Sequence, residues 1–235
     1  MPRKGTVLLN PIRAILRKLG LRARPGHRAD EELPRRLKPF LGFRNGFFVE
    51  AGANDGIAQS NTLRLERKLG WRGLLIEPIP ELAAKCRKNR PGSTVENCAL
   101  VASDTPDGSV TMHHCGLMSV LAGAMQPADE AAHLAKGQAL QTIEPYDIRV
   151  PARTLCAVLD QHEVDRIDFM SLDVEGCELD VLKGLDLERY RPRLLLIEVR
   201  NRHTMDAFLQ RRYEPVAALS AHATFQDVLY RARDA

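Results

Sequence analysis

The segment Phe47-Phe48-Val49-Glu50-Ala51-Gly52-Ala53-Asn54-Asp55-Gly56 predicts a buried strand that ends near an acid and then turns sharply on small residues. Gly52 and Gly56 have no Cβ, and Asn54 tolerates a positive φ, so the backbone of this turn can approach a ligand closely. Where such a turn leads into a helix, exposed amides favour an anionic group. The pattern indicates a nucleotide-type binding loop, although a tight strand-to-helix connection would use the same residues.

A second acid ends the next short apolar strand. The run Trp-Arg-Gly-Leu-Leu-Ile-Glu-Pro at residues 71–78 places Glu77 27 residues after Glu50. In doubly wound folds, an acid roughly 20 residues beyond the first turn accepts hydrogen bonds from ribose hydroxyls. We expect this role for Glu77, and the alternative is a solvated acid at a strand end.

Length and composition favour one domain. With 235 residues, of which 44% are hydrophobic, the chain can build a single α/β core. Its five cysteines are widely spaced without a C-x-x-C pair, which suggests neither a disulfide framework nor a thiolate zinc site. No apolar run approaches the roughly 18 to 20 residues of a membrane helix. Residues 6–9 are too few for a signal peptide, so we expect a cytoplasmic location.

Charge is distributed unevenly along the chain. Residues 1–44 hold 12 Lys or Arg and 3 Asp or Glu, whereas the remainder is acidic overall. Within this arm, apolar residues between positions 12 and 19 recur at helical spacing among basic ones, as in a basic amphipathic helix. Such a helix would bring residues 1–30 to an anionic membrane or a polyanionic partner. The alternative is a surface helix packed on the domain or a partly ordered terminus.

Apolar strands alternate with amphipathic helices, which predicts βα units and a mainly parallel sheet. The expected strands are 46–51, 71–77, 94–100, 167–172 and 194–199. The expected helices are 60–69, with Ser60 or Asn61 as N-cap and Gly70 as its end, and then 80–89, 127–140, 153–162 and 177–183. Residues 101–152 interrupt this rhythm, with a hairpin expected around Asp107-Gly108. Two strand-like runs at 213–219 and 224–232 suggest an antiparallel edge pair.

Several of these segments resemble the FkbM family of S-adenosylmethionine-dependent methyltransferases. The motifs are FVEAGANDG (48–56), SNT (60–62), GLLIEP (73–78), DFMSLDVEGCELDVLKG (168–184) and LLLIEV (194–199), and the resemblance covers about residues 45 to 200. The spacing of the first loop also fits an S-adenosylmethionine loop better than the G-x-G-x-x-G dinucleotide pattern. The resemblance implies a class I methyltransferase fold, a Rossmann-like doubly wound sheet, that acts mainly on hydroxyls, often of sugars. The predicted organisation is a basic arm at 1–44 and a methyltransferase domain at 45–235, with an acceptor-side insertion at 101–152.

The resemblance also implies which residues bind the cofactor. Strand ends and the glycine turn supply most of them, Asp55 or Ser60 would contact the methionine part, and the end of the third strand would pass the adenine. The expected cofactor-binding residues are Glu50, Gly52, Asn54, Asp55, Gly56, Ser60, Glu77, Pro78, Cys98 and Ala99.

The candidate catalytic groups are acids at the ends of the fourth and fifth strands. Class I methyltransferases place these strands beside the first, so the resemblance brings Asp173 and Glu198 to one edge, with Glu175 nearby. Methyl transfer to an alcohol requires removal of the hydroxyl proton by a base within hydrogen-bond reach. Repulsion among clustered acids would raise one pKa for this task. Alternatively, Mg²⁺ held by Asp173 and Glu198 would neutralise them, and His203 is a further candidate base.

The acceptor side offers two further observations. Adjacent residues of a strand point to opposite faces, so joint metal ligation by His113, His114 and Cys115 is awkward, and a structural or substrate-wall role is favoured. The following Gly116-Leu117-Met118-Ser119 occupies the variable acceptor-side segment of the family.

The leading hypothesis is an O-methyltransferase acting on a hydroxyl of a sugar or of a glycan or glycoconjugate precursor. One alternative is an N-methyltransferase on nucleic acid or protein. Such enzymes commonly carry an Asn/Asp-Pro-Pro-aromatic turn after the fourth strand, where this chain has Asp173-Val174-Glu175-Gly176, so no nucleic-acid partner is expected. The other alternative is a non-catalytic nucleotide-binding protein. An oligomer is compatible with the sequence.

Overall fold

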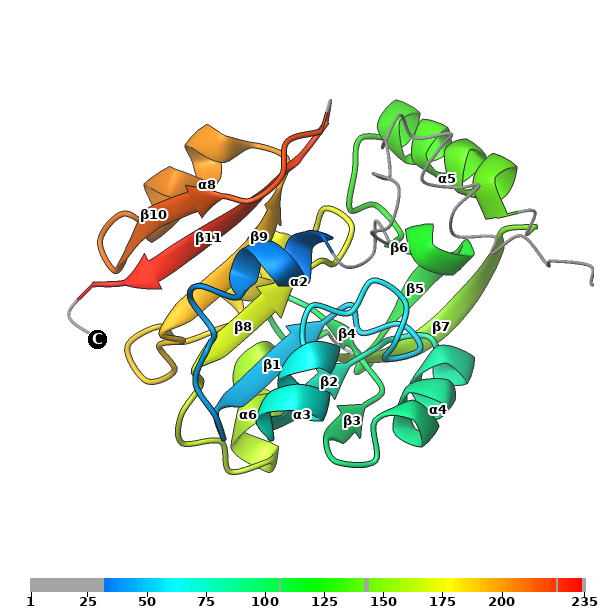
Figure 1. Cartoon of the computed structure of the whole chain (residues 1–235). Helices are drawn as coiled ribbons and strands as arrows, with labels where there is room; N and C mark the ends of the chain where they lie inside the picture. The colour runs from blue at the N-terminus through cyan, green and yellow to red at the C-terminus, as the bar shows by residue number, and fades with distance from the viewer. Residues whose placement is uncertain (1–31, 106, 142–143, 223, 234–235) are drawn as a thin grey trace, which may run out of the picture.

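A computed structural model describes residues 32–105, 107–141, 144–222 and 224–233, which form an α/β fold around a seven-stranded sheet (Figure 1). The strand order is β10-β11-β9-β8-β1-β2-β3. The strand β11 pairs antiparallel with both β10 and β9, and all other pairs in this sheet are parallel. The strands are β1 Phe47–Ala51, β2 Arg72–Ile76, β3 Thr94–Glu96, β8 Phe169–Leu172, β9 Leu194–Val199, β10 Tyr213–Ala218 and β11 Gln226–Ala232. The predicted doubly wound sheet with its antiparallel edge pair is confirmed.

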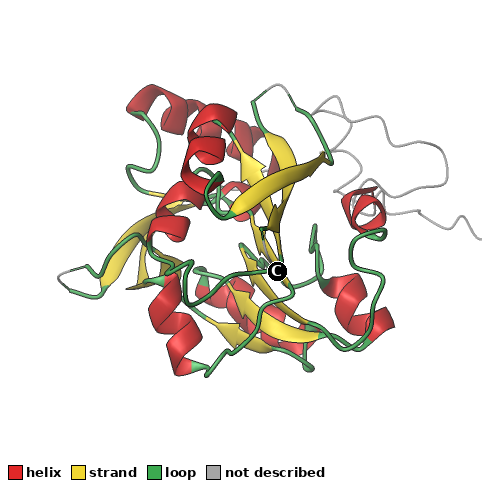
Figure 2. Cartoon of the chain, turned by 90° about the vertical axis from the view of Figure 1, so that its left-hand side faces the viewer, coloured by secondary structure: helices red, strands yellow, loops and turns green. Residues whose placement is uncertain are grey.

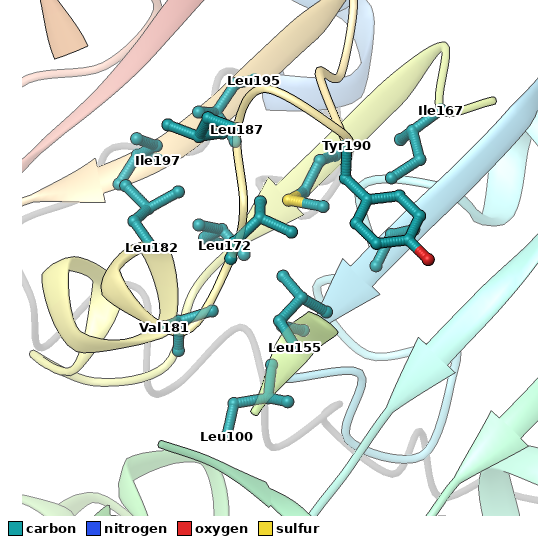
Figure 3. Packing of buried hydrophobic residues seen from close by; sticks show 14 of the residues in the cluster. Leu100, Leu155, Ile167, Leu172, Val181, Leu182, Leu187, Tyr190, Leu195 and Ile197 are labelled. Carbon is teal, nitrogen blue, oxygen red and sulfur yellow. The ribbon is translucent and has the colours of Figure 1, made fainter. Parts of the chain in front are cut away.

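Helices cover both faces of this sheet (Figure 2). On one face α6 Leu155–Gln161, α7 Glu178–Lys183 and α8 Arg202–Leu209 pack against the strands, and on the other face α2 Glu32–Leu37, α3 Leu63–Leu69 and α4 Pro80–Asn89 do so. Successive strand residues serve opposite faces: Leu195 and Ile197 join the first core (Figure 3), whereas Leu194 and Leu196 join the second. This alternation follows from the period of two in a strand.

The predicted insertion, together with β4 just before it, forms a second, smaller sheet with the strand order β4-β7-β5-β6. Its elements are β4 Ala99–Leu100, β5 Ser109–His114, the 3-10 helix η2 Gly116–Met118, β6 Val120–Leu121, the helix α5 Pro127–Gln141 and β7 Tyr146–Arg153. Figure 1 shows α5 on the side of the molecule that carries β5, β6 and β7, away from β10 and β11.

Two predictions about this region are wrong. The expected strand 94–100 is broken into β3 and β4, which belong to different sheets. Asn97 fixes the break, because its side-chain amide donates to the carbonyls of Glu77 and Pro78 at 2.8 Å each. The hairpin expected around Asp107-Gly108 is absent, since β5 pairs with β7 and β6 instead.

The helix expected from residue 60 begins later, at Leu63, with Thr62 at the N-cap position. Ser60 nevertheless supports this end, since its Oγ accepts from the amide of Leu63 at 3.1 Å. Gly70 ends the helix in the left-handed conformation (φ +69°), as predicted. The short helices α2 and α8 were not predicted.

The packed body begins before residue 45. Leu37 and Leu41 are buried in the core of the α3 and α4 face, although the sequence places both in the basic arm. The amphipathic helix expected near residues 12–19 lies outside the described residues. No helix in the described ranges is both long and apolar enough to cross a bilayer.

Candidate active site

A cleft with about 950 Å³ of empty space, including its solvent-open part, lies at the carboxyl ends of β1, β2 and β8. Ligands bind at this edge in open α/β sheets. Its lining comes from both sheets and comprises Glu50, Ala51, Gly52, Asn54, Ala58, Gln59, Asn61, Ile76, Glu77, Pro78, Leu82, Cys98, Ala99, Leu100, Met112, Gly116, Leu117, Ser119, Leu121, Ser171, Asp173, Val174, Glu175 and Cys177.

The turn after β1 has the left-handed backbone that its residues predict. The φ angles of Gly52, Asn54 and Gly56 are +83°, +50° and +78°. A Cβ on Gly52 would lie only 1.8 Å from the carbonyl oxygen of Asp173. Glycine is therefore required here by the close approach of the chain's own backbone, in addition to any ligand contact.

Glu50 is buried and holds the loop that follows β1. Its carboxylate accepts from Ser60 Oγ at 2.9 Å, the Asn61 amide at 2.7 Å and Thr62 Oγ1 at 2.5 Å. The fully buried Arg90 lies 3.7 Å away and also donates to the Gly56 carbonyl at 3.1 Å. Glu50 thus borders the cleft while its hydrogen bonds fix the surrounding loop.

Glu77 lies at the end of β2, as predicted, and lines the cleft. Its two oxygens accept from the amides of Asn54 (2.8 Å) and Ile79 (2.9 Å). Burial raises the pKa of Glu77 to about 7, and both amides oppose this rise. The carboxylate therefore connects the first loop to the start of α4.

The other expected cofactor residues divide into two groups. Pro78, Cys98 and Ala99 line the cleft, and burial raises the pKa of the Cys98 thiol to about 12. Asp55, Gly56 and Ser60 are absent from the lining. The Asp55 carboxylate instead accepts from two amides of its own loop, those of residues 57 and 58, and the Ser60 hydroxyl donates to Glu50. The expected cofactor contact of Asp55 or Ser60 is therefore not supported.

Asp173 follows β8 and lines the cleft beside Gly52. Among the residues that the structure describes, none donates a hydrogen bond to its carboxylate. Burial raises the pKa of Asp173 well above its ordinary value, and the carboxylates of Glu175, Glu178 and Asp227 raise it further. A carboxylate without donors and with a raised pKa is suited to accept a proton.

Arg200 lies among these acids and was not predicted. Its guanidinium donates to Glu175 at 2.8 Å and to Glu198 at 3.1 Å. Burial raises the pKa of Glu175 to about 7, although the charge of Arg200 lowers it. Burial and the nearby Asp173 carboxylate raise the pKa of Glu198 to about 10. The strand does not continue to Glu175, whose φ is +53°.

The arrangement does not fit the expected Mg²⁺ site. In the described ranges, no three His, Cys, Asp or Glu side chains are grouped so that they could hold a metal ion. Glu198 is absent from the cleft lining and is paired with Arg200. His203 is exposed in the first turn of α8, outside the lining, so the structure does not bring it to the acids.

The neighbouring histidines of β5 have separate partners, as the period of a strand predicts. His113 lies 2.6 Å from Asp147 and 3.2 Å from Glu130, whereas His114 contacts Ser119 Oγ at 2.9 Å. They form no joint site. The predicted acceptor-side segment does reach the cleft, since Gly116, Leu117 and Ser119 line it.

The model of the methyltransferase FkbM domain matches residues 50–230. The chain belongs to the FkbM methyltransferase family. It is therefore an S-adenosylmethionine-dependent methyltransferase, and the family resemblance stated from the motifs is confirmed. No curated protein matches the chain in the corresponding search.

Solved methyltransferase structures resemble the chain at low sequence identity. The METTL16 methyltransferase domain matches with a TM-score of 0.50 and 11% identity, over 94% of this chain and 77% of that one. An O-methyltransferase from Bacillus cereus in complex with SAH gives 0.48 and 12%, over 96% and 93%. A TehB-like S-adenosylmethionine-dependent methyltransferase from Corynebacterium glutamicum gives 0.45 and 11%, over 92% and 94%. At 11% identity, the likeness to the METTL16 domain concerns the fold alone.

Proposed function

We propose that the protein is an O-methyltransferase that acts on a hydroxyl of a sugar or of a glycan or glycoconjugate precursor. The observation that carries this proposal is the Asp173 carboxylate, which lines the cleft, accepts no hydrogen bond from a described residue and has a raised pKa. A hydroxyl is a poor nucleophile until its proton is removed, so the reaction needs such a base.

The cleft suits a cationic methyl donor. Its described lining includes the acids Glu50, Glu77, Asp173 and Glu175 and no Lys, Arg or His. S-adenosylmethionine supplies the methyl group on a positively charged sulfur, which acidic walls stabilise. Glu77 would accept from the ribose hydroxyls, Pro78, Cys98 and Ala99 would face the adenine, and Gly52 with Asn54 would border the methionine part.

Asp173 would act as the general base. Its carboxylate accepts the hydroxyl proton while the acceptor oxygen bonds to the methyl carbon and the carbon–sulfur bond breaks. The products are a methyl ether, the neutral thioether S-adenosylhomocysteine and a protonated Asp173. Glu175 is the second candidate, but its pairing with Arg200 at 2.8 Å favours the ionised form and weakens it as a base.

The charge of the cleft lining also restricts which acceptors can bind. A wall of four acids without a basic side chain disfavours a phosphate beside the reacting group. A sugar hydroxyl is neutral and accommodates this environment. Hydroxyls of unphosphorylated glycosides are therefore the acceptors that the cleft suits best.

Incubation of the pure full-length chain with methyl-labelled S-adenosylmethionine tests the proposal. The acceptor panel contains methyl glycosides, oligosaccharides, nucleotide sugars, phenols, RNA and a peptide mixture. We expect the label on the glycosides, where glycan analysis should detect it as a methyl ether of a sugar hydroxyl. Label only on RNA or peptide nitrogen would establish the N-methyltransferase alternative, and cofactor binding without transfer to any member would favour a non-catalytic protein.

A further inference from the structure

The cleft has a two-layered wall on its acceptor side. Residues 116–121, which we call the η2 wall, contribute Gly116, Leu117, Ser119 and Leu121 to the lining. The helix α5 packs on η2, but none of its residues whose side chains are described lines the cleft. The contacts of the helix with the η2 wall and with the loop that carries Asp173 and Glu175 are therefore routes by which it can influence a bound acceptor.

Gly137 brings α5 very close to η2. A Cβ at this position would lie 2.7 Å from Cys115 Sγ and 3.1 Å from Met118 Cβ. The φ of Gly137 is not positive, so the backbone conformation does not require glycine. Since glycine weakens a helix interior, the close approach of the two elements is its physical justification here.

His133, one helical turn before Gly137, lies between η2 and Glu175. Its Nε2 lies 3.0 Å from the carbonyl oxygen of Met118 in η2 and 3.6 Å from Glu175 Oε2. A carbonyl can only accept, so Nε2 carries the proton and donates it to Met118. The side chain is 8% exposed, and burial lowers the pKa of the imidazole. The buried ring thus lies between Met118 and Glu175.

A second contact joins the same segments. Met125, in the turn before α5, has its Cε 3.4 Å from the position that a Cβ on Gly176 would occupy. The segment 125–137 therefore touches the loop after β8 at one end and η2 at the other.

We propose that His133 is a positioning residue that sets the spacing between the η2 wall and Glu175, and thereby the binding of the acceptor. The inference rests on the proposed function, because the acceptor is placed between these two surfaces. His133 itself does not line the cleft. Its loss should widen the acceptor side of the cleft and leave the cofactor side, formed by the β1 and β2 ends, unchanged.

The test compares His133→Leu, which removes the donor, with His133→Gln, which retains an N–H donor. His162→Leu is the matched control, because His162 also pairs with a glutamate, Glu96 at 3.1 Å, away from the cleft lining. Calorimetry measures S-adenosylmethionine affinity, and kinetics with the best panel acceptor give KM and kcat. Hydrogen exchange of the peptide spanning 116–121 reports the η2 wall without activity.

For His133→Leu, we expect the acceptor KM to rise at least about 10-fold, with kcat and cofactor affinity within about 3-fold. Hydrogen exchange at 116–121 should be faster than in the wild type. The acceptor KM of His133→Gln should lie close to the wild-type value, and the control His162→Leu should resemble the wild type. An unchanged KM with unchanged exchange would overturn the inference, and so would a parallel loss of cofactor affinity. If the wild type methylates no acceptor, the proposed function fails separately, and exchange at 116–121 alone decides about His133.

Gly137→Ala gives an independent variant in case His133→Leu does not fold. Alanine is a better helix former than glycine. If Gly137 affected only α5, the Ala variant would therefore keep the wild-type acceptor KM and the wild-type exchange at 116–121. Displacement of Met118 instead predicts a higher acceptor KM and faster exchange at 116–121. Asp129→Ala, at an exposed position of the first turn of α5, is the control.

Discussion

Glu77 is the residue whose removal should affect the cofactor and spare the chemistry. It would accept from the ribose, and it already holds the amides of Asn54 and Ile79. We expect Glu77→Ala to weaken S-adenosylmethionine binding by about 1.5 to 3 kcal/mol, the range for a hydrogen bond to a charged group. Calorimetry measures the loss. Glu96→Ala, at the end of β3 and outside the lining, is the control, and equal affinity in the two variants with intact folds would refute the ribose role.

At this scale, the sequence predicts strand-end acids better than their partners. Glu77 and Asp173 stand directly after apolar strands, so their place at the sheet edge follows from the pattern. Arg90 and Arg200 were missed, since each contacts an acid distant in the sequence, Glu50 and Glu175 respectively. An arginine carries no periodic signal that reveals such a contact.

Among the elements, the turn after β1 gives a sharp prediction. In Gly52→Ala, the backbone has a positive φ and the new Cβ would lie 1.8 Å from the Asp173 carbonyl oxygen. Gly108→Ala is the matched control, because its φ is also positive (+64°) but no atom lies within 4 Å of the new Cβ. The control should lose about 1 to 2 kcal/mol from backbone strain alone. We expect Gly52→Ala to lose clearly more, or to fail to fold, as measured by urea denaturation. Equal losses would mean that the β1 and β8 ends adjust without cost.

The strands of the main sheet were predictable because buried parallel strands are nearly continuous apolar runs. The strand β7, which lies between β4 and β5, was missed, since proline interrupts its sequence Tyr-Asp-Ile-Arg-Val-Pro-Ala-Arg. The helix α8 did carry a signal: Asn201 caps it by accepting from the Thr204 amide at 3.0 Å. The break between β3 and β4 depends on Asn97 reaching another strand, which local sequence does not reveal.

For the whole molecule, two N-terminal deletions distinguish the role of the basic residues 1–30 from that of the packed body. We propose that residues 1–30 bind an anionic membrane or a polyanionic partner. Deleting them should preserve turnover and weaken binding to phosphatidylserine vesicles at low salt. Deleting residues 1–41 also removes the buried Leu37 and Leu41, and should cost roughly 3 to 6 kcal/mol of unfolding free energy. Loss of turnover in the shorter deletion would instead assign the arm to the cleft.

The buried acids should make the cofactor-free fold less stable as pH rises. The folded-state pKa of Glu77 is about 7, above its ordinary 4.5, so the folded chain binds this proton more tightly than the unfolded chain does. Stability therefore falls between pH 4.5 and 7, by at most about 3 kcal/mol for this group. Thermal unfolding of the wild type and Glu77→Gln at pH 5 to 8 measures it. The variant should show the smaller decline, and identical declines would contradict the assignment.

The central claim is that Asp173 takes the acceptor proton, and the pH dependence of kcat/KM for Asp173→Asn tests it most directly. A base works when ionised, so the wild-type rate should increase with pH through the raised pKa of Asp173, with or without EDTA. Asparagine should lower turnover by about 10² to 10⁴, remove that limb of the profile and leave cofactor affinity nearly unchanged. Near-normal turnover of Asp173→Asn, with the wild-type pH profile retained, would contradict the claim.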